Sequence, residues 1–293
     1  MSRSGSSLLR FLRHPLVLLP CKLLVVVAAY ILAGHLAQSW RWAGLGFPIA
    51  ATVLLSAAVW GAFALYTRWV EGRAVTEFAA RGALREWLAG LAIGILVFAA
   101  MIGLLGVLGV YRADGAAGAR SLIAPFCDAT LAGVFEETVC RGVLFRIIEQ
   151  SLGSYWALLI SSVLFGAAHL LNPNASLLAA AQIALEAGLL LGAAFMLTRR
   201  LWFAIGIHAG WNFAEGGIFG TVESGTSVHG LLHSTLQGPA WLSGGKFGVE
   251  ASPIALLVGL GVGLAILARA RQRHEVRSPA WLRAQPSATD VRP

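Results

Sequence analysis

Long apolar runs separated by short polar segments dominate the sequence. A helix needs about 20 mostly apolar residues to cross a bilayer, and this criterion predicts eight spans. They cover residues 16–38, 43–67, 88–111, 121–147, 154–171, 176–198, 201–220 and 252–268. Residues 71–86 mix apolar and charged side chains, which predicts an interfacial amphipathic helix or a cytosolic helical linker. The pattern therefore predicts an all-α fold, a polytopic membrane bundle of about eight transmembrane helices.

The same pattern divides the chain into three parts. Residues 1–15 are a basic cytosolic N-terminus, residues 16–268 a single transmembrane helical domain, and residues 269–293 a basic cytosolic tail that we expect to be disordered. Within the domain, residues 221–251 are rich in Gly and Ser and are expected to form an external loop.

The composition agrees with a membrane protein. Hydrophobic residues make up 57% of the chain and charged residues 12%, whereas a soluble domain has about 25% charged residues. The net charge of +8 lies in the segments between apolar runs, so it indicates membrane topology and no nucleic-acid partner. The three cysteines lie in apolar runs without CxxC spacing, which predicts neither disulfides nor a cysteine zinc site.

The basic residues also predict the orientation of the chain. With the N-terminus inside, inner segments hold sixteen Lys and Arg residues and outer segments hold four. Because cytoplasmic segments carry an excess of Lys and Arg, we expect both termini in the cytosol.

A charged cluster interrupts the apolar run at residues 121–147. Placing a charged side chain near the middle of a bilayer costs on the order of 2.5–3.5 kcal/mol. A cluster of three, Glu136, Glu137 and Arg141, therefore indicates a function inside the membrane. Helical spacing places Glu137 and Arg141 on one face, where they can pair. The pair is either a structural ion pair or a support for a catalytic site, and Glu136 is left for another partner.

Two further spans carry polar residues at helical spacing. His169 follows Phe165 by four residues, and Asn212 follows His208 by four. Polar groups in lipid must face other helices or a wet cavity, so we expect these residues to converge with the glutamates on one internal pocket. Glu186 is expected to contact this pocket, and Glu215 to line its outer rim.

The combination of one carboxyl group and two imidazoles in a membrane cavity indicates a hydrolytic function. A glutamate in an apolar setting suits a general base that deprotonates water, and a histidine beside it can hold that water. A second histidine and an amide can stabilise an oxyanion. Glu136, His169 and His208 are also an acceptable zinc ligand set with one open position, so metal-dependent and glutamate-only chemistry both remain open. The sequence contains no HExxH or GxSxG motif.

Three motifs on separate spans carry a family resemblance: Glu136-Glu137-xxx-Arg141, Phe165-xxx-His169 and His208-xxx-Asn212. Together they resemble the CPBP (formerly Abi) family of intramembrane proteases over about residues 121–220. That family includes type II CAAX prenyl endopeptidases and bacterial bacteriocin-processing and self-immunity proteins.

The resemblance implies a role for each motif residue. Glu136 would be the catalytic glutamate and His169 its partner on the water, while His208 and Asn212 would stabilise the oxyanion. Glu137 and Arg141 would support the site.

The sequence therefore predicts an endopeptidase in the bacterial cytoplasmic (inner) membrane that is either glutamate-dependent or a metalloprotease with Zn2+ as its candidate cofactor. Its expected partners are the lipid bilayer and a membrane-associated peptide or protein substrate. Two other functions are alternatives to the endopeptidase. One is an ion-coupled transporter that relays protons through the buried groups, and the other is a catalytically silent binding or immunity protein with the same fold.

Overall fold

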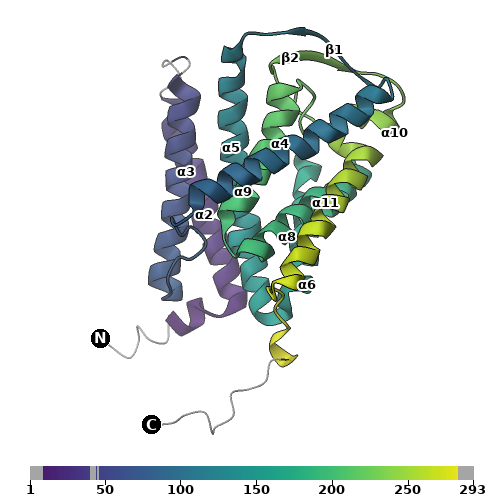
Figure 1. The fold of residues 1–293 in the computed structure, drawn as a ribbon. Helices are drawn as coiled ribbons and strands as arrows, with labels where there is room; N and C mark the ends of the chain where they lie inside the picture. Colours follow the sequence, from purple (N-terminus) through teal and green to yellow (C-terminus); the bar gives the residue numbers. More distant parts are fainter. Residues whose placement is uncertain (1–8, 40–43, 45, 283–293) are drawn as a thin grey trace, which may run out of the picture.

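The computed structural model describes residues 9–39, 44 and 46–282, and most of this part of the chain is helical (Figure 1). The helices are α2 (Pro15–Gln38), α3 (Gly46–Tyr66), α4 (Ala83–Val107), α5 (Ile123–Glu137), α6 (Arg146–Ala168), α7 (Leu177–Ile183), α8 (Leu189–Thr198), α9 (Leu201–Asn212), α10 (Ala240–Ser243) and α11 (Pro253–Gln272). Two short strands, β1 (Tyr111–Ala116) and β2 (Leu232–Leu236), form the one sheet of the described residues. The predicted class, an all-α membrane bundle, fits this architecture.

Six helical stretches among the described residues are long and apolar enough to cross a membrane. They are Pro15–Gln38, Gly46–Glu71, Ala83–Val107, Ala119–Leu171, Leu177–Thr198 and Pro253–Gln272. The fourth stretch contains two of the predicted spans, and the predicted span at 201–220 is not among the six. The chain is therefore a multi-pass membrane protein, and the number of eight spans stays a prediction.

The chain turns at Gly153, within α6. Its backbone has φ 80° and ψ 173°, a conformation that residues with a side chain rarely adopt. A Cβ atom at this position would also lie 2.8 Å from the carbonyl oxygen of Arg277. The turn sends the second arm of α6 back along the bundle, which brings His169 to the cavity that Glu136 lines.

Four glycines, two on each helix, hold α4 against α9. A Cβ atom at Gly90, Gly94, Gly206 or Gly210 would lie 2.2–2.4 Å from a backbone carbonyl oxygen of the facing helix. Both pairs have the small-xxx-small spacing that lets membrane helices approach closely. Figure 1 shows α4 crossing the bundle obliquely, over α9. Because His208 lies between the two glycines of α9, this contact also positions a predicted site residue.

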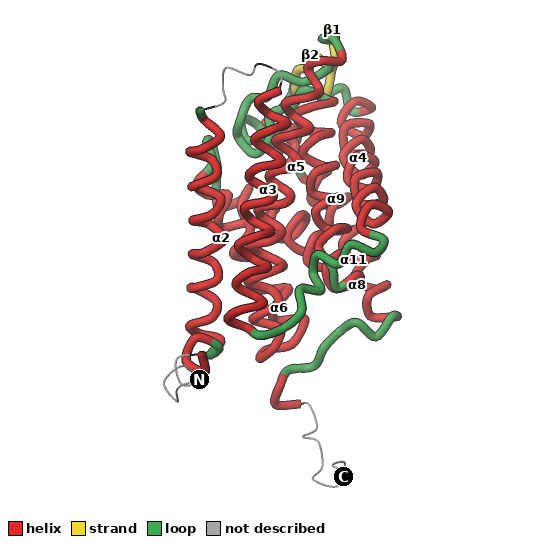
Figure 2. The backbone as a smooth tube through the Cα atoms, turned by 90° about the vertical axis from the view of Figure 1, so that its left-hand side faces the viewer, coloured by secondary structure: helices red, strands yellow, loops and turns green. Residues whose placement is uncertain are grey.

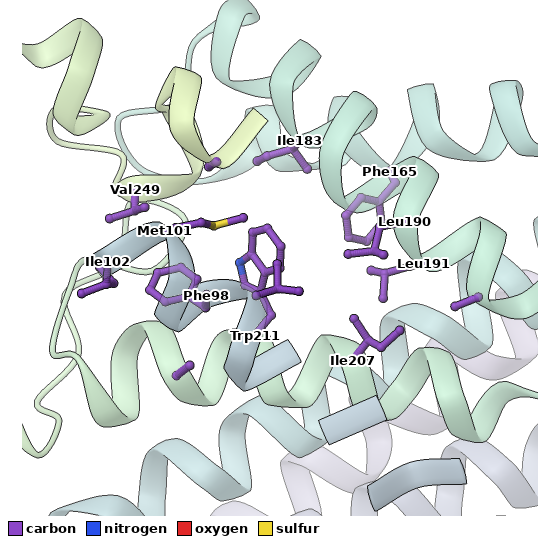
Figure 3. Close-up of a cluster of buried hydrophobic side chains, with 14 of the residues drawn as sticks. Phe98, Met101, Ile102, Phe165, Ile183, Leu190, Leu191, Ile207, Trp211 and Val249 are labelled. Carbon is purple, nitrogen blue, oxygen red and sulfur yellow. The ribbon is translucent and has the colours of Figure 1, made fainter. Parts of the chain in front are cut away.

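One of the three apolar clusters among the described residues surrounds Trp211 (Figure 3). The ring of Phe98 lies 5.8 Å from the Trp211 ring, and Met101 is fully buried beside them. Several members of this cluster also form the apolar wall of the candidate site: Phe165, Leu190, Leu191, Ile207 and Trp211. The candidate site is therefore lined by the hydrophobic core itself.

A two-stranded antiparallel sheet covers one end of the bundle (Figures 1 and 2). Tyr111 of β1 pairs with Leu236 of β2, and the Tyr111 hydroxyl donates a hydrogen bond to the carbonyl oxygen of Phe219 at 3.0 Å. The predicted external loop at 221–251 thus contains regular structure. The sequence pattern did not reveal it, because the two strands lie far apart along the chain and are short.

The predicted helix at residues 71–86 is wrong over most of its length. A π-helical segment ends at Glu71, residues 72–82 are irregular, and α4 begins at Ala83. Polar groups of this segment are bound by other parts of the chain instead: the Arg200 guanidinium donates to the carbonyl oxygen of Ala79 at 3.1 Å and pairs with Glu86. Such long-range contacts override the local helical preference.

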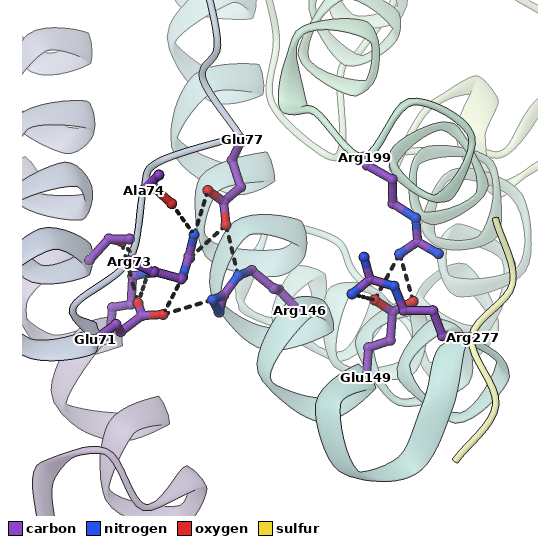
Figure 4. A network of polar contacts seen from close by, with 10 residues as sticks. Glu71, Arg73, Ala74, Glu77, Arg146, Glu149, Arg199 and Arg277 are labelled. Atoms are coloured by element: carbon purple, nitrogen blue, oxygen red, sulfur yellow. Dashed lines mark hydrogen bonds and ion pairs between the residues drawn. The ribbon is translucent and has the colours of Figure 1, made fainter. Parts of the chain in front are cut away.

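Ion pairs join the segments at the end of the bundle where α2 begins and α11 ends (Figure 4). We call this set the interfacial network; it consists of Glu71, Arg73, Glu77, Arg146, Glu149, Arg199 and Arg277. Lys22 of α2 also belongs to it, because this fully buried side chain pairs with Glu71. The described ends of the chain therefore lie on one side of the bundle; which side faces the cytosol stays a prediction.

The three-part division of the chain also stays a prediction. Helix α11 continues to Gln272, past the predicted end of the last span, and the Ser154 backbone N–H donates to the carbonyl oxygen of Arg277 at 2.9 Å. Residues 1–8 and 283–293, which include parts of the predicted basic N-terminus and tail, lie outside the described residues.

Candidate active site

Glu137, Arg141 and His208 form a buried chain of polar contacts. The Arg141 guanidinium donates to Glu137 Oε1 at 2.8 Å and to the carbonyl oxygen of Gly188 at 2.9 Å. His208 Nδ1 lies 3.0 Å from the same Glu137 oxygen. Glu137 and Arg141 are fully buried, and His208 is 6% exposed. The pairing of Glu137 with Arg141 is the one that helical spacing predicts. The contact with Glu137 fixes the orientation of the His208 ring.

Glu136 stands apart from this chain of contacts. Its Oε2 atom lies 3.9 Å from His208 Nε2, and its side chain is 34% exposed, whereas that of Glu137 is fully buried. A carboxylate accepts hydrogen, so His208 Nδ1 donates to Glu137 and Nε2 is directed toward Glu136. The two neighbouring glutamates therefore occupy different environments, one in an ion pair and one at a cavity.

Phe165 separates the two histidines. Its ring centre lies 4.8 Å from that of His169 and 6.0 Å from that of His208, and the Arg141 guanidinium lies over its face at 4.7 Å. His169 Nδ1 donates to the Phe165 carbonyl oxygen at 2.8 Å, so Nε2 carries the free lone pair. The Phe-xxx-His spacing thus orients His169 through its own helical turn.

A cavity of about 270 Å³ brings the predicted residues together. Glu136, His169, His208 and Asn212 all line it, from α5, the end of α6 and α9. Segments of π-helix begin directly after Glu137 and after Asn212. Such segments are frequent at functional sites, where they redirect side chains. The structure thus brings four predicted residues to one cavity, and their catalytic roles stay predictions.

Six polar residues that line the cavity were not predicted from the sequence: Asp128, Asn172, Glu223, Ser224, Thr226 and Glu250. Asp128 precedes Glu136 by eight residues on the same helix, a spacing of about two turns that could have identified it. Glu223 and Glu250 come from the segments beside the sheet, where no helical period exists to place them.

Glu186 and Glu215 do not line the cavity. Both are fully buried, and none of their four carboxyl oxygens has a hydrogen-bond partner within the described residues. Glu215 lies against Gly248, within electrostatic range of Glu250 and Glu223. The prediction that Glu186 contacts the pocket and that Glu215 lines its rim is therefore wrong: they lie behind the wall.

The described residues do not support the predicted zinc ligand set. No group of three His, Cys, Asp or Glu side chains in this part of the chain has the spacing of a metal site. Glu136 and His208 approach each other, but His169 is held by Phe165 and does not complete the set. Whether the site uses a metal stays open, as the sequence left it.

Comparison with known families supports this site. Residues 118–214 match the family model described as type II CAAX prenyl endopeptidase Rce1-like. This segment is Rce1-like. The match covers all three motifs and confirms the predicted family, which includes the type II CAAX endopeptidases. No curated protein and no solved structure matches the chain. The Rce1-like segment includes α5, α6 and α9, from which the motif residues reach the cavity.

Proposed function

We propose that this protein is an intramembrane endopeptidase in which Glu136 activates the water that hydrolyses a peptide bond. The observation that carries the proposal is the contrast between the two neighbouring glutamates: Glu137 is engaged by Arg141 and His208, while Glu136 faces the cavity. The Rce1-like match of the segment supports a protease. A membrane-associated peptide or protein is the proposed substrate, and the inner cell membrane the proposed location.

The mechanism assigns one task to each group. Glu136 accepts a proton from water as the water oxygen attacks the carbonyl carbon, and His169 Nε2 accepts a hydrogen bond from that water. Asn212 and a protonated His208, whose charge Glu137 stabilises, donate hydrogen bonds to the oxyanion. The C–N bond then breaks, and Glu136 returns its proton to the leaving amine.

Peptide cleavage in water enriched with oxygen-18 tests this proposal. Purified protein in liposomes is incubated with membrane-spanning peptides, and mass spectrometry locates the cut. One heavy oxygen is expected in the new carboxyl group. Glu136→Gln should reduce the rate by about 10²- to 10⁴-fold, the usual contribution of a general base. Asp114→Asn changes an exposed carboxylate of β1 that does not line the cavity, and it should cleave normally.

A chelator arm tests the role of metal. Because the described residues form no three-ligand group, cleavage should survive dialysis against a strong chelator. Equal cleavage by wild type and Glu136→Gln would remove Glu136 from the mechanism. Transport of ions without any cleavage would favour the transporter alternative, and binding without cleavage would favour a silent family member.

A further inference from the structure

The wall of the catalytic cavity is strongly acidic. Asp128, Glu136, Glu223 and Glu250 line it, and no Lys or Arg is among the described residues that do so. The guanidinium of Arg141, which pairs with Glu137, is fully buried. In a low-dielectric cleft, carboxylates of one sign focus the field and attract cations.

A second acidic layer lies behind this wall. Glu215 is fully buried, has no hydrogen-bond partner for either carboxyl oxygen, and lies within electrostatic range of Glu223 and Glu250. The Ser224 hydroxyl donates a hydrogen bond to Glu250. Buried carboxyl groups are normally paired with a cation or held neutral by a proton. The carboxyl groups of Glu215, Glu223 and Glu250 therefore lie together without a described cationic partner. A cationic side chain in the cavity could supply the missing positive charge.

We propose that the outer part of the cavity binds a Lys or Arg side chain of the substrate, and that Asp128, Glu223 and Glu250 select for it. This inference rests on the proposed protease function. The grouping of Glu223 with Asp128, Glu136 and His208 within electrostatic range places the selecting carboxylates beside the catalytic ones. Burial and the nearby Glu250 raise the pKa of Glu223 to about 8, so this carboxyl group is largely protonated near pH 7, and a bound Lys or Arg side chain would favour its ionised form.

The dimensions of the site define where the cationic residue lies in the substrate. Asp128 and Glu136 are eight residues apart on α5, about 12 Å along the helix axis. An extended peptide covers this distance in about three or four residues. The cation therefore lies within about four residues of the cleaved bond. The cavity, at about 270 Å³, is close to the small end of ligand pockets and admits one side chain with its backbone, not a folded domain.

A matched peptide series tests the inference. One position, moved from four residues before to four residues after the cut, carries Lys, Arg, norleucine, citrulline or Glu. Lys and Arg at the selecting position should raise kcat/KM about ten- to a hundredfold over norleucine and citrulline, as expected for charged hydrogen bonds. Glu at this position should be cleaved most slowly.

Variants identify the carboxylates responsible. Asp128→Asn and Glu223→Gln should reduce the preference for Lys and Arg, while Asp114→Asn should keep it. Asp128→Lys should improve cleavage of the Glu peptide, a gain that a merely misfolded protein cannot show. Equal cleavage of all five peptides would overturn the substrate inference and leave the protease function standing.

A binding measurement separates the two proposals if no peptide is cleaved. Fluorescence polarisation of labelled Lys and norleucine peptides reports binding without chemistry. Tighter binding of the Lys peptide, lost in Asp128→Asn, would support the cationic subsite while the protease function fails. Equal binding of both peptides would overturn the subsite as well.

Discussion

The interfacial network and the candidate cavity are both rich in charged side chains, but only in the network is each carboxylate paired with cationic side chains. Each network carboxylate contacts at least two cationic side chains: Glu71 contacts Lys22, Arg73 and Arg146, for example. Glu149 likewise contacts Arg199 and Arg277, with its side chain 2% exposed. These pairs join segments that are distant in the sequence.

The cavity has the opposite arrangement. Arg141 is bound to Glu137, and no Lys or Arg forms an ion pair with Asp128, Glu136 or Glu223 among the described residues. Paired carboxylates are held in fixed, ionised states, whereas an unpaired carboxyl group near an imidazole can accept and return a proton. The difference suggests that the network holds the bundle together and that the cavity is left short of cations for chemistry and recognition.

The largest expected effect comes from Glu136→Gln. Cleavage should fall about 10²- to 10⁴-fold, because the general base is lost, while the melting temperature stays close to that of wild type, because no described ion pair with Lys or Arg is broken. Kinetics and thermal unfolding of the same preparation measure both. A large loss of stability would place Glu136 with the structural carboxylates.

Glu71→Gln should lower the stability of the protein and leave its cleavage rate unchanged. It leaves the fully buried Lys22 without its carboxylate, and breaking a buried pair costs about 3–5 kcal/mol of unfolding free energy. Residual folded protein should cleave at the normal rate per molecule. Glu275→Gln is the control: its side chain is 37% exposed and pairs with Arg199, and exposed pairs contribute only about 0–1 kcal/mol. A stable Glu71→Gln variant would contradict the structural role of the network.

Gly94→Leu tests the cavity region through helix packing and leaves every charged side chain in place. A side chain here collides with the backbone of α9, the helix that carries His208, so stability should fall by about 1–3 kcal/mol and cleavage should fall with it. Gly103→Leu is the matched control on α4, since a Cβ atom there has nothing within 4 Å. Equal melting temperatures for the two variants would show that α4 and α9 do not pack as described.

The last prediction concerns the pH dependence of stability. The pKa of Glu223 is raised from 4.5 to about 8 by burial and by Glu250, so the folded state binds a proton that the unfolded state releases. Stability from this group therefore falls as pH rises from about 4.5 to 8. Glu223→Gln removes this contribution, so its melting temperature should fall less between pH 4.5 and 8 than that of wild type.

Other titrating groups face Glu223, namely Glu250, His208, Asp128 and Glu136, so the readout is the difference between variant and wild type. Asp114→Asn should keep the wild-type pH profile. Identical profiles for Glu223→Gln and wild type would show that Glu223 is already ionised, and hence that the cavity is not short of cations at neutral pH.

Local spacing in the sequence was sufficient for the helices and for part of the site. Apolar length alone identifies membrane helices, because lipid requires every backbone group to be bonded within its own segment. The pairing of Glu137 with Arg141 follows from a four-residue separation, and the orientation of His169 by Phe165 has the same spacing. These contacts lie within one helical turn, so no other segment is needed to predict them.

Tertiary structure alone decided the rest of the site. His208 reaches Glu137 from another helix, and Glu223 and Glu250 enter the cavity wall from segments near a sheet that no periodicity predicts. Glu186 and Glu215 were expected at the pocket and lie behind it. Which buried face of a helix meets a cavity depends on how neighbouring helices pack, and glycine contacts and long-range ion pairs set that packing. The charge balance of each region is therefore a property of the folded chain.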